Sequence, residues 1–155
     1  LLNDLGILNI LEITSWEEIV PVKNLEGMYA QFKMNLELPF TKEEKNNIAA
    51  IRRIIGSNHV DKFTVYHYGL YLSLVAGEIL NIDKKKINKI NKELPIHDKK
   101  EINIKANEIV NVLEIDYSKK IGIILKEIEN LIISGKIRNR KGDIIKYLKE
   151  HKSEW

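Results

Sequence analysis

Apolar residues along this chain recur at intervals of three and four, which is the spacing of one face of an α-helix. Ile48, Ile51, Ile54 and Ile55 form one such stripe, and segments with strand-like alternation are scarce. Hydrophobic residues make up 44% of the 155 positions, which is enough to bury a core. The pattern predicts an all-α fold, with an irregular multi-helix body followed by a small helical tail subdomain.

Residues 1–82 are predicted to form the helical body. Thr41 is followed three residues later by Glu44, which is the capping-box pattern of a helix start. The most apolar segment follows, and we expect it at the centre of the body, with its interior face made by Phe63, Tyr66, Leu70, Leu74, Ala76 and Gly77. The helices expected in this half cover residues 1–11, 25–36, 42 to the turn at 56–58, and 60–80.

Residues 83–155 are predicted to form the tail, whose helices are shorter and whose turns carry lysines. Asp83 is expected to cap a helix in which Ile87 and Ile90 oppose the lysines, and Pro95 to stop it. Gly135 is placed as a C-terminal glycine that closes a long helix. The helices expected after Pro95 cover residues 106–113, 118–133 with Ser118 as the cap, and 143–149.

The net charge of +3 is distributed unevenly. Residues 1–82 carry 7 Lys and Arg against 10 Asp and Glu, whereas residues 83–155 carry 18 against 12. A positive tail attracts phosphate backbones, because each neutralised phosphate releases counterions. Lysine-rich helices are also ordinary solvated surface, so the charge alone does not distinguish these two interpretations.

The composition bears on the cellular compartment of the protein and on whether it has a membrane segment. Cysteine is absent, which removes disulfides and thiolate zinc sites and suits a reducing cytosol. The longest nearly charge-free run, residues 63–77, is shorter than the ~20 apolar residues that span a bilayer. No signal-like segment opens the chain. We therefore expect a cytoplasmic protein without a membrane segment.

Histidines and tyrosines are further candidates for chemistry. His97-Asp98 lacks the additional His and Asp residues of an HD phosphohydrolase, and His59 and His67 lie roughly 80° from a common helix face. No metal site is expected from them. The tyrosine cluster Tyr66–Tyr71 has the chemistry to stack bases, as in single-strand binders, but its apolar segment favours a role in packing.

A family resemblance rests on the order of several short motifs. The motifs are Leu36–Lys42, then Leu94-Pro95-Ile96, Lys100-Glu101-Ile102 with Ile104, Gly122 before Ile124-Leu125, and Gly135-Lys136-Ile137 with Asn139. In this order they resemble the body and tail of bacterial tRNA nucleotidyltransferases, the CCA-adding enzymes of the poly(A) polymerase superfamily. The chain departs from the family pattern at two turns, with Lys105-Ala106 where Asn-Gly is usual and Ser118-Lys119 where Gly-Pro is usual.

The resemblance also implies a catalytic head that this sequence lacks. Nucleotidyl transfer needs carboxylates that converge on Mg²⁺, and the family supplies them from an Asp-x-Asp pair. No two aspartates here are spaced by one residue, no Gly-rich phosphate loop is present, and the chain opens on Leu1 rather than methionine. We therefore expect a C-terminal fragment that binds RNA without catalytic residues, metal ligands or cofactors of its own. Mg²⁺ and CTP or ATP would belong to the missing head.

The candidate RNA contacts are basic residues at the turns of the tail. A helix N-terminus presents unpaired N–H groups and partial positive charge, which favour a phosphate, and a nearby cation strengthens the attraction. The predicted contacts are Lys99, Lys100, Lys105, Lys119, Lys120, Arg138 and Arg140.

The function that the resemblance implies is tRNA recognition, in which the tail grips the elbow of the tRNA while the head adds C, C and A. The expected partners are tRNA and the head domain, and association into homo-oligomers stays open. One alternative is the tail of a poly(A) polymerase of the same superfamily, and another is a non-enzymatic helical module that holds a protein partner. Salt dependence separates these classes, because phosphate binding weakens steeply with salt.

Overall fold

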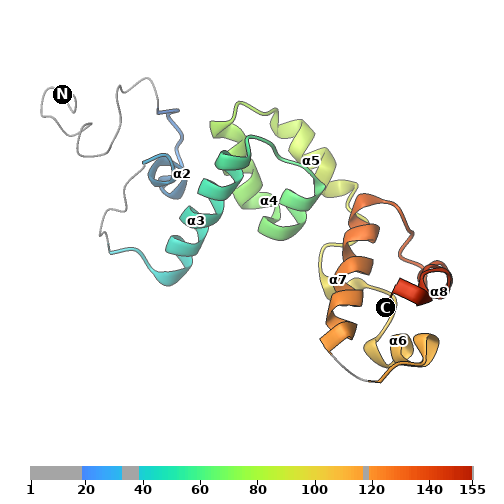
Figure 1. Cartoon of the computed structure of the whole chain (residues 1–155). Coiled ribbons are helices and arrows are strands. Elements are labelled where there is room, and N and C mark those ends of the chain that lie inside the picture. The colour runs from blue at the N-terminus through green and yellow to red at the C-terminus, as the bar shows by residue number, and fades with distance from the viewer. Residues whose placement is uncertain (1–18, 33–38, 117–118, 155) are drawn as a thin grey trace, which may run out of the picture. The chain divides into compact units, whose positions relative to one another are not determined.

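The structure is a computed structural model that describes residues 19–32, 39–116 and 119–154, and every regular element in these ranges is a helix (Figure 1). The all-α prediction is confirmed. The expected helix at 1–11, the end of the one at 25–36 and the cap at Ser118 lie outside the described residues. The elements are α2 (Leu25–Ala30), α3 (Lys42–Ser57), α4 (Lys62–Ile79), α5 (Lys84–Lys92), the 3₁₀ helix η2 (Lys99–Glu101), α6 (Ala106–Leu113), α7 (Lys119–Ser134), α8 (Lys141–Glu150) and the 3₁₀ helix η3 (Lys152–Glu154).

The chain divides into two compact units, and the boundary in the sequence falls between Asn91 and Lys92. This boundary lies beyond the one expected after residue 82, so that α5 belongs to the first unit except for its last residue, Lys92. The reason is a close contact between α4 and α5: Ile87 is fully buried, and a Cβ added at Gly77 would overlap the Ile87 Cδ1 atom. The lysine-rich helix α5 is therefore anchored on α4 by its apolar face.

Helix α3 begins and ends where the sequence predicts. The Thr41 Oγ1 accepts a hydrogen bond from the Glu44 N–H at 3.2 Å, and the Glu44 Oε2 accepts one from the Thr41 N–H at 2.7 Å, which completes the capping box. Ile48, Ile51 and Ile54 are buried. Their helix packs against α2 and α4, and α4 in turn contacts α2, α3 and, at Gly77, α5, as expected for the helix at the centre of this unit.

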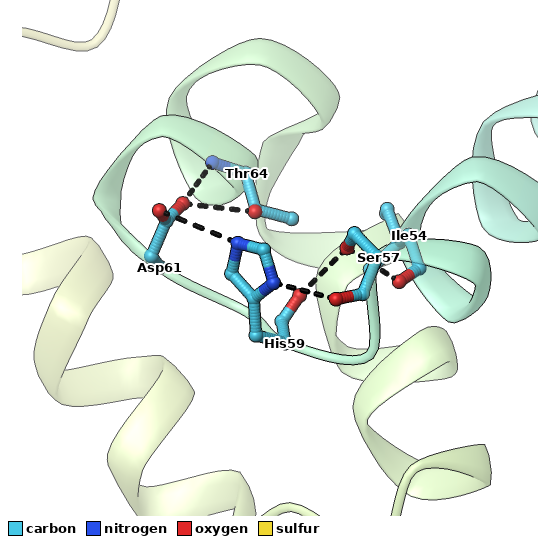
Figure 2. A network of polar contacts seen from close by, with 5 residues as sticks. All are labelled: Ile54, Ser57, His59, Asp61 and Thr64. Carbon is cyan, nitrogen blue, oxygen red and sulfur yellow. Dashed lines mark hydrogen bonds and ion pairs between the residues drawn. The ribbon is translucent and has the colours of Figure 1, made fainter.

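The turn between α3 and α4 is held by polar contacts (Figure 2). Asn58 adopts the left-handed conformation, with φ at 57°. The His59 Nδ1 lies 2.7 Å from the Ser57 carbonyl oxygen, and its Nε2 lies 3.7 Å from the Asp61 Oδ2. Asp61 caps α4, since its Oδ1 accepts hydrogen bonds from the Thr64 N–H at 2.8 Å and the Thr64 hydroxyl at 2.9 Å. Partial burial opposes these bonds, but they outweigh it and the pKa of Asp61 lies below its ordinary value.

Helix α4 is broken at Gly69, whose φ of 78° and ψ of 166° are open to glycine and strained for other residues. The break rotates the face that points inward. The residues buried on α4 are Thr64, Val65, Ser73, Val75, Ala76 and Gly77. A single stripe does not describe both halves of the broken helix: Ala76 and Gly77 are buried as predicted, whereas Phe63, Tyr66, Leu70 and Leu74 are half-buried rather than buried.

The second unit packs α6, α7 and α8 around a core rich in isoleucine. Its side chains with no exposed surface include Ile109, Ile124, Ile128, Ile132, Ile144 and Leu148. Helix α6 has the predicted bounds, and Gly135 closes α7 with φ at 80°, as its position in the sequence predicts. Helix α8 begins at Lys141, two residues before the predicted start. In the part of the chain that the structure describes, no helix combines the length and apolar character needed to cross a bilayer.

Candidate nucleic-acid interface

The seven basic residues predicted as RNA contacts are all exposed, and they lie at the ends of elements in the second unit. Two are on η2, one precedes α6, two open α7, and two lie in the connection from α7 to α8. In that order they are Lys99 and Lys100, Lys105, Lys119 and Lys120, and Arg138 and Arg140. The structure divides them into two groups.

Helices α6 and α8 pack against each other, and an ion pair joins them near each end. Glu108, in the first turn of α6, forms an ion pair with Lys141, the first residue of α8. At the other ends of the helices, the Lys152 Nζ lies 2.6 Å from an oxygen of Glu114, the residue that follows α6. Two helix N-termini are therefore at the same end of this unit, and their partial positive charges add there.

Asn139 ties a third segment to that end. Its Oδ1 accepts a hydrogen bond from the Asn103 N–H at 2.8 Å, and its Nδ2 donates to the Glu101 carbonyl oxygen at 2.8 Å. The loop that carries η2 is thereby joined to the loop between α7 and α8. The segments joined in this way carry five of the seven predicted residues, which we call the basic end: Lys99, Lys100, Lys105, Arg138 and Arg140.

Asn139 was not predicted to position these residues, although it is one of the residues that carry the family resemblance. The available signal was an asparagine between two arginines, just after a helix that ends in glycine. An asparagine side chain has both a donor and an acceptor, so it can bridge two stretches of backbone. The two backbone groups that Asn139 bonds belong to Asn103 and Glu101, which precede it by 36 and 38 residues.

Lys119 and Lys120 form a separate group at the start of α7. Helix α7 has 16 residues and a rise of about 1.5 Å per residue, so its two ends lie roughly 24 Å apart, with these lysines at one end and the connection that carries Arg138 after the other. Lys120 lines a shallow pocket together with Glu114 and Asp116. The field at this end of the unit is therefore mixed in sign.

The first residues of α6 and α8 lack the usual side-chain cap. The N-cap residues are Lys105 and Arg140, and neither side chain makes a capping hydrogen bond. Lysine and arginine have no acceptor atom, so they cannot receive the first-turn N–H groups. By contrast, the N-caps of α2, α3 and α4 in the first unit accept such bonds through Asn24, Thr41 and Asp61.

The first turns of α6 and α8 each hold one acidic residue, Glu108 and Asp143. Glu108 contacts both helix starts. Its carboxylate accepts a hydrogen bond from the Lys141 side chain and, at 2.9 Å, one from the Lys105 N–H. These bonds, the Lys141 bond first, hold the pKa of Glu108 below its ordinary value. Its charge is thus offset chiefly by Lys141, and Asp143 adds a second negative charge in the first turn of α8.

The difference in net charge between the two structural units is smaller than the difference between residues 1–82 and 83–155. Residues 92–155 carry 14 Lys and Arg against 11 Asp and Glu, a net charge of +3. Residues 1–91 carry 11 of each, because the four lysines between 84 and 89 lie in the first unit. Over the described ranges, no three His, Asp or Glu side chains gather closely enough to hold a metal ion.

The sequence is similar to a known protein family and to several of its characterised members. A family model described as "tRNA nucleotidyltransferase domain 2 putative" matches residues 22–148. The chain is 29% identical over 136 residues to a CCA-adding enzyme of Streptococcus sanguinis, and 25% identical over 134 residues to that of Streptococcus mutans. These matches cover 84% and 83% of this chain and 33% of each relative, so the chain spans about a third of the length of these relatives.

A solved structure has the same fold. The crystal structure of the Bacillus stearothermophilus CCA-adding enzyme in complex with CTP superposes with a TM-score of 0.73 at 15% identity. The match covers 85% of this chain and 39% of that one. At this identity the likeness concerns the fold.

Proposed function

Because this chain belongs to the tRNA nucleotidyltransferase domain 2 family, we propose that it is the tRNA-gripping region of a CCA-adding enzyme. In this proposal the chain binds tRNA, and nucleotide addition is carried out by a catalytic head. The relatives in the comparison are named as CCA-adding enzymes, which favours CCA addition over poly(A) addition. A cytoplasmic location goes with this proposal, and homo-oligomers are compatible with it.

The observation that carries the proposal is the pair of helix starts at the basic end. Lys105 and Arg140 occupy N-cap positions without supplying an acceptor, and Asn139 holds Lys99, Lys100 and Arg138 on the adjoining loops. A phosphate oxygen is an acceptor with negative charge, so it satisfies first-turn N–H groups and pairs with the cations. The basic end therefore suits an RNA backbone better than a neutral protein surface.

Backbone contact also suits a substrate class whose sequences vary. A-form RNA presents phosphates and 2′-hydroxyls, while its deep major groove hides the base edges from side chains. Cations on helix starts recognise the spacing of phosphates without reading sequence. An enzyme that acts on all tRNAs needs recognition of this kind, and the shared shape of folded tRNA supplies such a surface.

The test is tRNA binding by charge-reversal variants of the whole chain over a range of salt concentrations. Lys105→Glu with Arg140→Glu changes the basic end, and Lys119→Glu with Lys120→Glu changes the start of α7. Lys42→Glu with Lys45→Glu, exposed on α3 in the first unit, is the matched control. Each lost phosphate contact should reduce the slope of log K against log salt by about 0.7–0.9. We expect a loss from both tail pairs and little change from the control.

Two further measurements complete the test. Full-length tRNA should bind more tightly than single-stranded RNA of equal charge, since the proposed contact follows the shape of a folded RNA. Equal binding of the two RNAs, or equal effects of all three variant pairs, would contradict the proposal. Binding that is insensitive to salt would instead favour a helical module that holds a protein partner.

A further inference from the structure

The first unit contains a second feature that suits RNA, outside the unit that carries the basic end. A pocket of about 520 Å³ lies where the second half of α4 meets the connection to α5. Tyr71, Leu74 and Ile82 give it apolar walls. Glu78, Asn81 and Lys84 are exposed around it. Its volume falls within the range of about 300–1,000 Å³ that is usual for small-ligand sites.

Tyr71 is held in place while its ring stays open to solvent. The Asn24 Nδ2 donates a hydrogen bond to the Tyr71 hydroxyl at 2.5 Å, and that hydroxyl lies 3.4 Å from a carboxylate oxygen of Glu26. The residue nevertheless keeps 55% of its surface exposed. A tyrosine placed for packing would bury its ring. Here the hydroxyl is anchored and the ring is left available, so little rotamer freedom would be lost when a ligand stacks on it.

The pocket lies beside the start of the most lysine-rich helix. Lys84, Lys85 and Lys86 open α5 and are exposed, and the first turn holds no acidic residue. Asp83, just before the helix, accepts a hydrogen bond from the Lys85 N–H at 2.8 Å and so caps the helix. An aromatic surface beside the cationic start of a helix is a combination with which proteins bind single-stranded nucleic acid, because bases stack on the ring and cations pair with the phosphates.

We propose that this pocket binds one unpaired nucleotide of an RNA strand, with the base stacked on Tyr71 and its phosphate near Lys84–Lys86. The inference rests on the proposed function in that RNA is the partner, and it adds a site for single-stranded RNA to the backbone contact of the tail. Glu78 offers an acceptor and Asn81 offers both a donor and an acceptor at the edge of the pocket. The negative charge of Glu78 directs the phosphate toward the lysines.

The test compares a single-stranded RNA with an oligonucleotide of equal length and charge in which several central positions are abasic. Binding to the whole chain is measured by fluorescence anisotropy at fixed salt. Tyr71→Ala should weaken binding of the base-bearing strand about 5- to 150-fold, the range that stacking contributes per base. Binding of the abasic strand should not change. Tyr71→Phe keeps the ring and should stay close to the unmodified chain.

The matched control is Leu25→Ala, because Leu25 is 59% exposed in the same unit and lies outside the pocket. It should leave both strands unaffected. Lys84→Gln should weaken both strands alike and reduce the salt slope by about 0.7, the value for a contact to a single strand. Melting curves of each variant establish that it folds.

Two results would overturn the inference: equal binding of the base-bearing and abasic strands by the unmodified chain, or equal binding of the base-bearing strand by Tyr71→Ala and Leu25→Ala. A pocket that holds a peptide side chain would give the first result. Failure here is distinct from failure of the proposed function, which is decided by tRNA binding of the Lys105 and Arg140 variants.

Discussion

Replacing Lys105 with serine should make the protein more stable than an alanine variant and a weaker RNA binder. Lys105 is the N-cap of α6, with φ at −106° and ψ at 157°, an extended conformation that serine adopts without strain. Half of a capping box is already present, since the Glu108 Oε2 accepts a hydrogen bond from the Lys105 N–H at 2.9 Å. A serine hydroxyl would supply the other half, as the Thr41 hydroxyl does for α3.

The size of each effect follows from the contacts involved. A side-chain N-cap stabilises a protein by about 1 kcal/mol relative to alanine, which raises Tm by roughly 2–4 °C in a chain of this length. Loss of the lysine removes one phosphate contact, so the salt slope falls by about 0.7–0.9 in Lys105→Ala and Lys105→Ser alike. The serine hydroxyl also occupies an N–H group that the phosphate would otherwise use. Lys105→Ser should therefore bind tRNA up to about fivefold more weakly than Lys105→Ala.

The assay combines thermal melting with tRNA binding measured between 50 and 200 mM salt. Over this range, the loss of one phosphate contact should make the fall in affinity with salt about threefold smaller. The two variants should rank in opposite orders, with serine the more stable and alanine the tighter binder. A serine variant that melts no higher than alanine would mean that the first turn of α6 has no open donor. A serine variant that binds like the unmodified chain would mean that Lys105 does not meet a phosphate.

Three further predictions test other parts of the structure. Gly77→Ala places a methyl group against the fully buried Ile87 and should destabilise the first unit by about 1–3 kcal/mol. Gly122→Ala lies in open space on α7 and should stabilise the protein by about 0.5–1 kcal/mol. Denaturant unfolding curves measure both changes. The lowered pKa of Glu108 contributes stability that is complete above the ordinary value of 4.5 and is lost as pH falls through the folded-state pKa. The difference in Tm between the unmodified chain and Glu108→Gln should therefore shrink from pH 6 to pH 3, and a difference that persists at pH 3 would refute the linkage. The chain alone should not add CTP or ATP to a tRNA that lacks its CCA end, and Mg²⁺-dependent extension by the purified chain would contradict the assignment of catalysis to a separate head.

Helix ends were predictable wherever one or two neighbouring residues determine them. Thr41 and Glu44 cap α3 through contacts three residues apart, and Gly135 ends α7 because glycine adopts a positive φ at low cost. The bounds of α6 followed in the same way from its local pattern. Helix caps depend on residues within a few positions of one another, so they can be predicted from the sequence alone.

The interior face of α4 and the grouping of the basic residues were not predictable in this way. Periodicity across residues 60–80 assumes one continuous helix, whereas the break at Gly69 changes the register between the two halves of α4, so that one stripe cannot describe both halves. The basic end depends on Asn139, which joins loops more than 30 residues apart in sequence, and on the ion pair between Glu108 and Lys141. Such contacts are set by packing of whole helices, and spacing along the chain does not encode them.

The two helix starts at the basic end are the strongest departure from local rules in the described part of the chain. Asn24, Thr41, Asp61 and Asp83 each place an acceptor where a helix begins. Lys105 and Arg140 do the opposite, and the Glu108–Lys141 pair puts these two helix starts side by side. A general abundance of lysine would scatter cations over many turns, and it would not account for an arginine at one of the two positions. A chain that gives up two caps of about 1 kcal/mol each at adjoining sites is expected to use those sites for binding an external acceptor.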